Sequence, residues 1–463
     1  SNREDQSTAG ASTPTSSAAT IEELQNLIES GYNSQAIALM SANTALIESC
    51  FSTGFAPLHV AAAHLNQPLV EWLLAHGADP NAKGNGFAPM DLAAIAAQRQ
   101  PGKAESGAFT AITRLLLGAG GRLTARSAVA LGEAGWLGAR RDEGAPANRA
   151  ADAGSMLLTV AVRHNRPQIL KMLLDFGIDP DEQLHWLETP ASSSGTPLWW
   201  SARGGKLEMA GELLSRDADP SAAVDVSGSP MFQAYASHDW AMVDLLMRFG
   251  GKVQATTAGL FRQTELARTM LVGEGDALPE VGDSSQESLG EQLLWGGACG
   301  GDPEIVAMAL ERVDWPPDDQ RWYRMLEQPL RMWKYGGEKD LDREGHLTCF
   351  GLILRRCNPN IVGRFGLTIL HGVAGSRGHL TPGEQVGLAT MLLDAGARLD
   401  LRDELLKSTP LGWACRWGRI ELVKLFLDRG ADLIEKDAES WASPRTWAEK
   451  KGHSEILALL GAP

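Results

Sequence analysis

The residues best suited to chemistry are spaced too widely for the sites that they suggest. Cys349 and Cys357 stand eight positions apart, close to His346, and cysteine and histidine together commonly bind zinc. On a helix this spacing places the two sulfurs on one face but two turns apart, too far to share a tetrahedral ion. Most of the five cysteines lie inside apolar helical phrases, where a free thiol behaves as a small buried hydrophobic group. We therefore expect no metal site, no disulfide framework and no cofactor.

Side chains that could transfer protons also have simpler structural explanations. The ten histidines are scattered singly, mainly in turns, where a bonded or surface histidine is more common than a catalytic one. Asp318 and Asp319 follow two prolines and suit the start of a helix, where the dipole favours negative charge. The glycine pairs in 295–302 follow no strand, so they favour close helix packing or a turn over a phosphate-binding loop. The sequence therefore predicts no catalytic residues.

Charge and hydropathy exclude two classes of partner. The chain carries 57 acidic and 42 basic residues, a formal net charge of -15, and such a surface repels the phosphates of nucleic acid. It has no apolar run of about eighteen residues, so we expect no membrane span. Cysteine usage favours a reducing compartment, which makes the cytoplasm the expected location. The Ser- and Thr-rich residues 1–19 also suit a stretch that follows a removed export signal, so an exported protein is the alternative.

A recurring phrase organises the chain. It reads LLAHGADPNAK at 73–83, LLDFGIDPDE at 173–182 and LLSRDADPSA at 213–222, with looser copies at 392–403 and 426–437. An opening phrase precedes several copies, and its prolines recur after 32, 33 or 34 residues. A hydroxyl before proline can cap a helix whose first turn contains that proline. Such a unit has one apolar face and must stack on its neighbours, which predicts a solenoid of helix–turn–helix units.

The order of these phrases resembles that of the ankyrin repeat, whose period is about 33 residues. Each unit opens on a phrase similar to TPLH, continues through two helices joined by a short turn, and closes on a phrase similar to GADP. His59 and His371 keep the histidine of TPLH, which the family uses for hydrogen bonds within the turn. The resemblance implies an all-α fold, an ankyrin-repeat α-solenoid of about ten helix–turn–helix units with short β-turn tips and several inserted loops. Other residues replace the histidine elsewhere: Asp91, Thr159, Trp199, Phe232 and Gly412.

Departures from the repeat indicate how the chain is divided. Residues 20–50 contain two helical periods without an opening phrase, as expected for an N-terminal cap. The Gly-, Asp- and Ser-rich residues 273–290 are typical of a loop. The predicted order is a disordered arm (1–19), capping helices (20–50), a first repeat block (51–272), a flexible loop (273–290), a divergent region with an expanded repeat (291–364), and a second repeat block with a C-terminal cap (365–463).

Tryptophan is unusually frequent, with 14 residues against 4 tyrosines. Trp200, Trp413 and Trp447 occupy the same slot, four positions after the helix cap, where the ankyrin family packs an apolar residue between repeats. Trp417 instead precedes Gly418 in the turn between helices and is expected on the concave side. Tryptophan and arginine are enriched in binding hot spots. The candidate recognition patch is therefore Leu405, Leu406, Arg416, Trp417 and Trp441.

The ankyrin resemblance implies a protein-binding role, since the family ordinarily carries no catalytic apparatus. We therefore expect a monomeric, non-enzymatic scaffold that binds a protein or peptide through its concave face and turn tips. Further candidate contacts are Thr53, Phe55, Asn85 and Phe87 at the tips, with His64 and Arg203 on the inner helices. Two alternatives stay open. One is an enzyme or regulator with a cryptic catalytic segment within 257–345, and the other is a structural protein that self-assembles through the ends of its stack.

Overall fold

The computed structural model places most of the chain in helices joined by short turns. It describes residues 18–99, 107–142, 156–182, 195–222, 228–273, 287–332, 341–376 and 380–461. By its internal contacts the chain separates into two compact units, Ser1–Pro230 and Met231–Pro463. In the described residues, no helix combines the length and the apolar composition that crossing a membrane requires.

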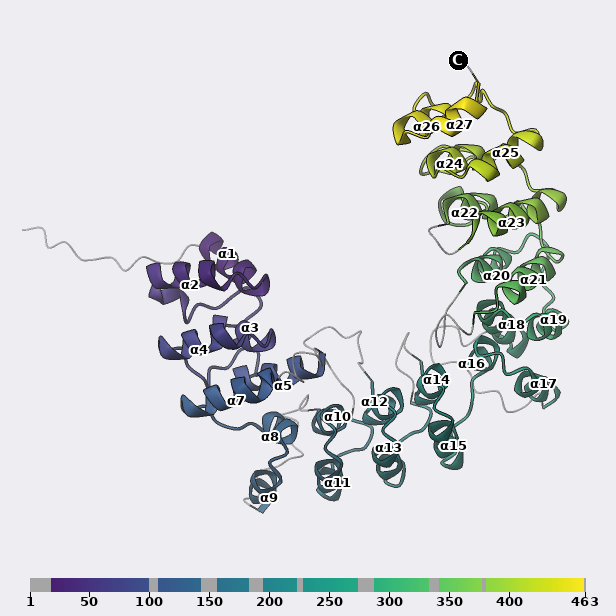
Figure 1. The fold of residues 1–463 in the computed structure, drawn as a ribbon. Coiled ribbons are helices and arrows are strands. Elements are labelled where there is room, and N and C mark those ends of the chain that lie inside the picture. The colour runs from purple at the N-terminus through teal and green to yellow at the C-terminus, as the bar shows by residue number, and fades with distance from the viewer. Residues whose placement is uncertain are drawn as a thin grey trace, which may run out of the picture. The chain divides into compact units, whose positions relative to one another are not determined.

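The first unit is a row of helix pairs (Figure 1). First helices of neighbouring pairs pack on each other, as α3 does on α5 and α10 on α12, and second helices do the same, as α11 does on α13. The unit therefore has two helical layers. Its helices are α1 (Ala18–Glu29), α2 (Asn33–Ala42), η1 (Thr44–Leu46), α3 (Pro57–Ala63), α4 (Gln67–Ala75), α5 (Pro89–Arg99), α7 (Ala108–Gly118), α8 (Ala125–Leu131), α9 (Ala134–Asp142), α10 (Leu157–Arg163), α11 (Pro167–Asp175), α12 (Pro197–Arg203) and α13 (Leu207–Leu214).

The second unit repeats this arrangement. From α16 onward the even-numbered helices are the first helices of their pairs and form one layer, and the odd-numbered second helices form the other. The connections between α20 and α21 and between α22 and α23 are longer than those within the other pairs. Its helices are α14 (Pro230–Ala236), α15 (Trp240–Arg248), α16 (Ala255–Leu260), α17 (Thr264–Val272), α18 (Leu289–Gly300), α19 (Pro303–Leu310), α20 (Arg321–Leu330), α21 (Arg343–Leu354), η5 (Arg364–Gly366), α22 (Ile369–Gly375), α23 (Pro382–Asp394), α24 (Pro410–Arg416), α25 (Ile420–Asp428), α26 (Pro444–Lys451) and α27 (Ser454–Leu459). The core of each unit lies between its two layers.

The opening phrases form the helix starts that the sequence predicts. The Thr196 side chain accepts a hydrogen bond from the Trp199 N–H, and Pro197 takes the first position of α12. Thr409 caps α24 in the same way by accepting from the Gly412 N–H at 3.2 Å. Each bond satisfies a backbone donor that the first helical turn leaves free. At the other end of a pair, Gly430 follows α25 with a φ of 87°, a left-handed conformation that glycine adopts without strain.

The all-α ankyrin solenoid is confirmed, although its helix pairs outnumber the roughly ten units predicted. Pairs such as α8–α9 and α16–α17 lack the opening proline by which the sequence reveals a unit. Within the region of the predicted expanded repeat, α20 and α21 pack together. Residues 20–50 form α1, α2 and η1, and α1 buries only Leu24 and Ile28, which suits the end of a stack.

Two predicted boundaries differ from the structure. Residues 1–17 of the predicted arm lie outside the described residues, but Ala18 and Ala19 already belong to α1. Most of the predicted loop 273–290 also lies outside them, while α18 begins at Leu289. The helices on either side of this loop pack together within the second unit, so the compact units meet at Pro230 and Met231 instead. The division into repeat blocks stays a prediction.

Glycines make the close approach of α16 and α18 feasible. A Cβ atom added to Gly259 would lie 2.5 Å from the Gly297 nitrogen, and one added to Gly296 would lie 2.5 Å from the Thr256 carbonyl oxygen. Real Cβ atoms do not approach backbone atoms so closely, because the atoms would overlap. The prediction that the glycine pairs of 295–302 serve close helix packing is therefore confirmed.

Candidate functional site

In several units the fourth position of the TPLH-like phrase joins one turn to the next. His371 hydrogen-bonds the Ser408 carbonyl through Nε2 at 3.0 Å, and His59 makes the equivalent contact with its own neighbouring turn. Burial lowers the pKa of both histidines, which favours the neutral ring. Trp199 replaces the histidine and donates its Nε1 proton to the Gly228 carbonyl at 3.1 Å. The predicted turn role of this slot is confirmed, and an indole can perform it.

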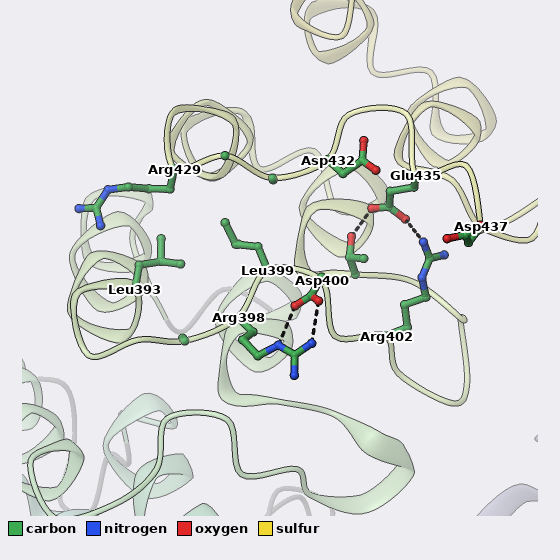
Figure 2. Close-up of a pocket in the computed structure, with 13 residues that line it drawn as sticks. Leu393, Arg398, Leu399, Asp400, Arg402, Arg429, Asp432, Glu435 and Asp437 are labelled. Atoms are coloured by element: carbon green, nitrogen blue, oxygen red, sulfur yellow. Dashed lines mark hydrogen bonds and ion pairs between the residues drawn. The ribbon is translucent and has the colours of Figure 1, made fainter.

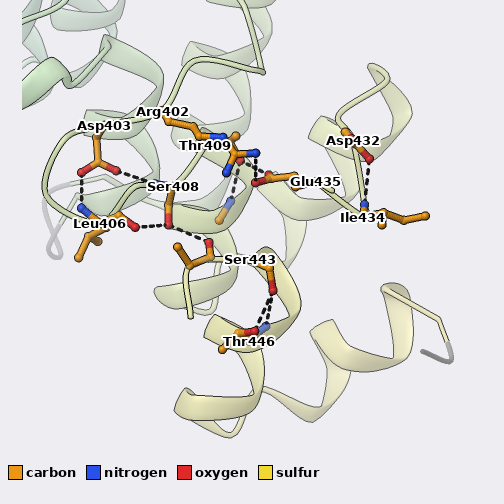
Figure 3. A network of polar contacts seen from close by, with 12 residues as sticks. Arg402, Asp403, Leu406, Ser408, Thr409, Asp432, Ile434, Glu435, Ser443 and Thr446 are labelled. Carbon is orange, nitrogen blue, oxygen red and sulfur yellow. Dashed lines mark hydrogen bonds and ion pairs between the residues drawn. The ribbon is translucent and has the colours of Figure 1, made fainter. Parts of the chain in front are cut away.

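Gly412 has no side chain for this slot, and Ser408 fills the space (Figure 3). A Cβ atom added to Gly412 would lie 3.0 Å from the Ser408 Cβ. The Ser408 hydroxyl lies 3.0 Å from the Ala442 carbonyl of the next turn and accepts a 2.7 Å hydrogen bond from Trp447 Nε1. Ser408 therefore links two successive turns and fixes the orientation of one indole ring.

Asp403 fixes the turn that carries the two predicted leucines. Its carboxylate accepts hydrogen bonds from the Leu405 N–H at 2.9 Å, the Leu406 N–H at 2.7 Å and Trp413 Nε1 at 2.8 Å. Leu405 is 52% exposed, whereas Leu406 is half-buried and packs against the core of the second unit. Of the two predicted leucines, Leu405 alone presents a large apolar surface.

Three of the predicted recognition residues meet around a tryptophan that the prediction assigned to the core. The Arg416 guanidinium carbon lies 4.3 Å from the centre of the Trp447 ring and 5.6 Å from that of Trp417. Trp441 meets Trp447 edge-on at 6.1 Å, and the Lys450 ammonium lies 5.2 Å from the same ring. We call Arg416, Trp417, Trp441, Trp447 and Lys450 the Trp–Arg patch. Leu405 and Leu406 lie on the preceding turn.

The patch is positioned by ends of first helices. Arg416 is the last residue of α24, and Trp417 is its C-cap, followed by Gly418 with a φ of 69°. Trp447 and Lys450 lie on the next first helix, α26, and Trp441 lies in the turn before it. Trp447 is 6% exposed and Trp441 is 40% exposed. A rigid buried ring therefore supports exposed aromatic and cationic groups.

The first unit contains a related stack around Arg203. The Arg203 guanidinium lies 5.3 Å from the Trp199 ring and 5.8 Å from the Trp200 ring. Arg163, at the end of α10, lies 4.0 Å from the Trp200 ring. The sequence analysis identified Arg203 but not Arg163, Trp447 or Lys450. These residues share a sequence pattern. A cation occupies the seventh position of a first helix, and a tryptophan occupies the fourth position of the same first helix or of the next one.

The predicted turn tips of the first unit are joined by one hydrogen bond. Asn85 donates its side-chain amide to the Thr53 carbonyl at 2.6 Å, so the two tips are adjacent. Phe55 is half-buried with its ring 5.6 Å from that of His59. Phe87 is also half-buried, because the Arg126 guanidinium from the next repeat lies 4.7 Å over its ring. These aromatic rings are less available to a partner than the prediction assumed.

His64 lies apart from these tips. It is the C-cap of α3, and its Nδ1 contacts the Val60 carbonyl one turn earlier at 2.9 Å. This bond closes the end of its own helix. The structure thus groups Thr53 with Asn85, and Arg416 with Trp417 and Trp441, while His64 and Arg203 stand on separate repeats.

A polar groove lies between two turns of the second unit (Figure 2). It has a volume of about 620 Å³ and lies between 393–402 and 429–437. Its cations are already paired: Arg398 with Asp400, Arg402 with Glu435 and Arg429 with Asp394. Burial raises the pKa of Glu435, which also accepts a hydrogen bond from Thr409. The groove was not predicted, although arginine and acidic residues alternate in both looser copies of the closing phrase.

Polar and aromatic residues within 257–345, the segment of the enzyme alternative, form structural contacts. Trp322 is fully buried and packs edge-on against Trp315 at 4.8 Å. Arg321 pairs with Asp319 and Glu291 at 2.8 Å each. The hydrogen bond with Arg321 lowers the pKa of Asp319. Ionised and paired in this way, these groups stabilise the start of α20.

The cysteine and histidine set is likewise occupied by packing. His346 contacts the Asp342 carbonyl through Nδ1 at 2.7 Å and the Cys299 carbonyl through Nε2 at 3.1 Å, so both ring nitrogens have partners. Burial raises the pKa of the Cys349 thiol, and that of Cys357 to about 12. Cys299, Cys349 and Cys415 are buried, as expected for most of the cysteines, Cys357 is half-buried, and Cys50 is exposed. In the described residues no cluster of ligands suited to a metal ion occurs.

The two layers of paired helices define a helical-repeat solenoid, in which each pair buries its apolar face on its neighbours. Family models identify the repeats. A model of ankyrin repeats in three copies matches residues 342–437, and models of the single ankyrin repeat match 53–85 and 153–182. The chain is an ankyrin repeat protein. No curated protein matches it.

Ankyrin repeats are in general modules for protein–protein interaction, and the family is typically non-enzymatic. Arg416 and Trp417 lie within the three-copy match. Trp441, Trp447 and Lys450 lie immediately after it, in the final helix pair and the turn before it.

Proposed function

We propose that this chain is a non-enzymatic scaffold that binds a protein or peptide, with the Trp–Arg patch as its main contact surface. Membership of a family of interaction modules supports binding as the activity. Arg416, Trp447 and Lys450 lie on first helices, the layer that the ankyrin resemblance assigns to the concave side. The turn tips at Thr53 and Asn85 would provide a second, smaller contact in the first unit.

One observation carries this proposal. Trp441 is 40% exposed although its ring meets the buried ring of Trp447 edge-on. Large apolar groups held at the surface beside arginine are typical of binding hot spots, because a partner that covers them removes apolar area from water. Arg416 adds a donor of five N–H groups at the same place.

Variants of the full chain test the proposal by the capture of peptides from a random library displayed on phage. The double variant Arg416→Ala with Trp417→Ala, and Trp441→Ala alone, should each reduce the affinity of captured peptides about tenfold or more, as hot-spot residues do. The matched control replaces Trp240 and Arg248, which are exposed on α15 of the same unit. It should leave capture unchanged.

The thermal melting curve distinguishes loss of binding from loss of the fold. Trp441→Ala should melt close to the wild-type temperature, because substitution of an exposed side chain usually changes stability little. Capture that is equal for wild type, patch variants and control would contradict the assignment of the patch. Capture that fails even for the wild-type chain would contradict peptide binding altogether.

A further inference from the structure

The Trp–Arg patch holds cations that the chain itself does not neutralise. In the described part of the chain, neither Arg416 nor Lys450 forms an ion pair with a carboxylate, and each lies over an aromatic ring. Several other arginines of the second unit do have an acidic partner. Examples are Arg268 with Glu304, Arg321 with Asp319, Arg343 with Glu384, and Arg429 with Asp394. Two cations without acidic partners therefore share one small surface in a chain of net charge -15.

The stacking of Arg416 leaves its polar edge available. A guanidinium that lies over an aromatic ring uses its flat face for the contact, while its N–H groups stay in the plane of the group. Those N–H groups fit the two oxygens of a carboxylate. Because Arg416 and Lys450 already lie over Trp447, a positively charged ligand would meet repulsion at this ring.

The surroundings limit how much negative charge the patch can accept. Glu449 lies on α26 beside Lys450, and Arg445 is 3.9 Å from it. A long polyanion would meet this carboxylate as well as the negative net charge of the chain. Trp441, 40% exposed, and Leu405, 52% exposed, instead offer apolar contact to side chains that flank a short acidic group.

We propose, on the basis of the function proposed above, that the Trp–Arg patch binds an extended acidic segment of a partner protein. One or two carboxylates of the segment pair with Arg416 and Lys450, and a neighbouring apolar side chain packs on Trp441. Binding of this kind becomes weaker as salt concentration rises, because exposed charges are screened.

A selection from a library of random dodecapeptides on phage tests this proposal with the full chain. Peptides retained by the wild-type chain should be enriched in Asp and Glu relative to the unselected library. The double variant Arg416→Glu with Lys450→Glu should bind them at least about tenfold more weakly, since like charges now face each other. The matched control, Arg248→Glu with Lys451→Glu, makes the same change of charge on α15 and beside Lys450 on α26 and should retain them.

The outcomes separate the two proposals. If retained peptides have no excess of acidic residues but still require Trp441, the acidic-segment proposal is wrong and the binding function stands. If acidic peptides bind the charge-reversed variant as well as the wild type, acidic binding occurs elsewhere and the proposal is also wrong. If no peptide is retained, both proposals fail. The milder variant Arg416→Gln with Lys450→Gln, checked by circular dichroism, should show the same loss if the charge-reversed variant folds poorly.

Discussion

The two units contain the same stack of cation on tryptophan, but they surround it differently. Arg163 lies 4.0 Å from the Trp200 ring in the first unit, and Arg416 lies 4.3 Å from the Trp447 ring in the second. In both cases the cation ends one first helix and the ring belongs to the next. Trp200 is half-buried, whereas Trp447 is 6% exposed.

What differs is the set of residues outside the repeated slots. In the second unit the Trp447 indole donates to Ser408, and Trp417 and Trp441 extend the aromatic surface. In the first unit the extra ring is Trp199, which is 3% exposed and serves the turn. The packing of one repeat on the next therefore accounts for the cation–tryptophan contact in both units. Residues outside the repeated slots decide whether an exposed surface forms around that contact.

Truncation of the two central rings should separate their roles most strongly. Trp447→Ala should reduce the free energy of unfolding by about 3–5 kcal/mol, because it leaves a cavity under the patch. Trp200→Ala should cost about 1–2 kcal/mol, since that ring already has contact with water. Urea denaturation of the full chain measures both changes. Equal losses would show that the two rings are equivalent and would contradict the comparison.

A third tryptophan in the same slot allows a smaller test. Trp413 lies on α24, and the seventh position of the preceding first helix, α22, is Gly375 instead of a cation. A Cβ atom added to Gly375 would lie 2.7 Å from the Trp413 ring. Gly375→Ala should therefore reduce the free energy of unfolding by about 1–3 kcal/mol, the usual cost of overpacking.

Gly372 in the same helix provides the control, because an added Cβ atom there would meet nothing within 4 Å. Gly372→Ala should leave stability unchanged or raise it by up to about 1 kcal/mol, since alanine favours helix more than glycine does. If thermal melts show the same change for both variants, close contact with Trp413 does not explain the glycine.

The fold was predictable because its signals are local and recur. Helix caps at Thr196 and Thr409 and the closing phrases act within one repeat, so the sequence displays them directly. Units without the opening proline, such as α16 and α17, were harder to recognise. Gly259 and Gly296 come together only when the helices stack, so their pairing could not be read from local sequence.

The candidate site was predictable in part for the same reason. Arg416, Trp417 and Trp441 stand out by residue type, and the structure brings them together. Trp447 was assigned to the core because it fits the repeat pattern, yet it is also the ring that supports the patch. Lys450 belongs to the patch because its side chain contacts Trp447, one helical turn earlier. Composition alone does not distinguish such a lysine from an ordinary surface lysine.

Hydrogen–deuterium exchange with a peptide retained by the wild-type chain tests the central claim most directly. Binding at the Trp–Arg patch should slow exchange in residues 410–417 and 441–451, because a bound segment covers the end of α24, the turn before α26 and α26 itself. Residues 157–163 and 197–203 of the first unit should exchange as before. Protection confined to the first unit, at its stack or at the tips 53–55 and 84–87, would contradict the account.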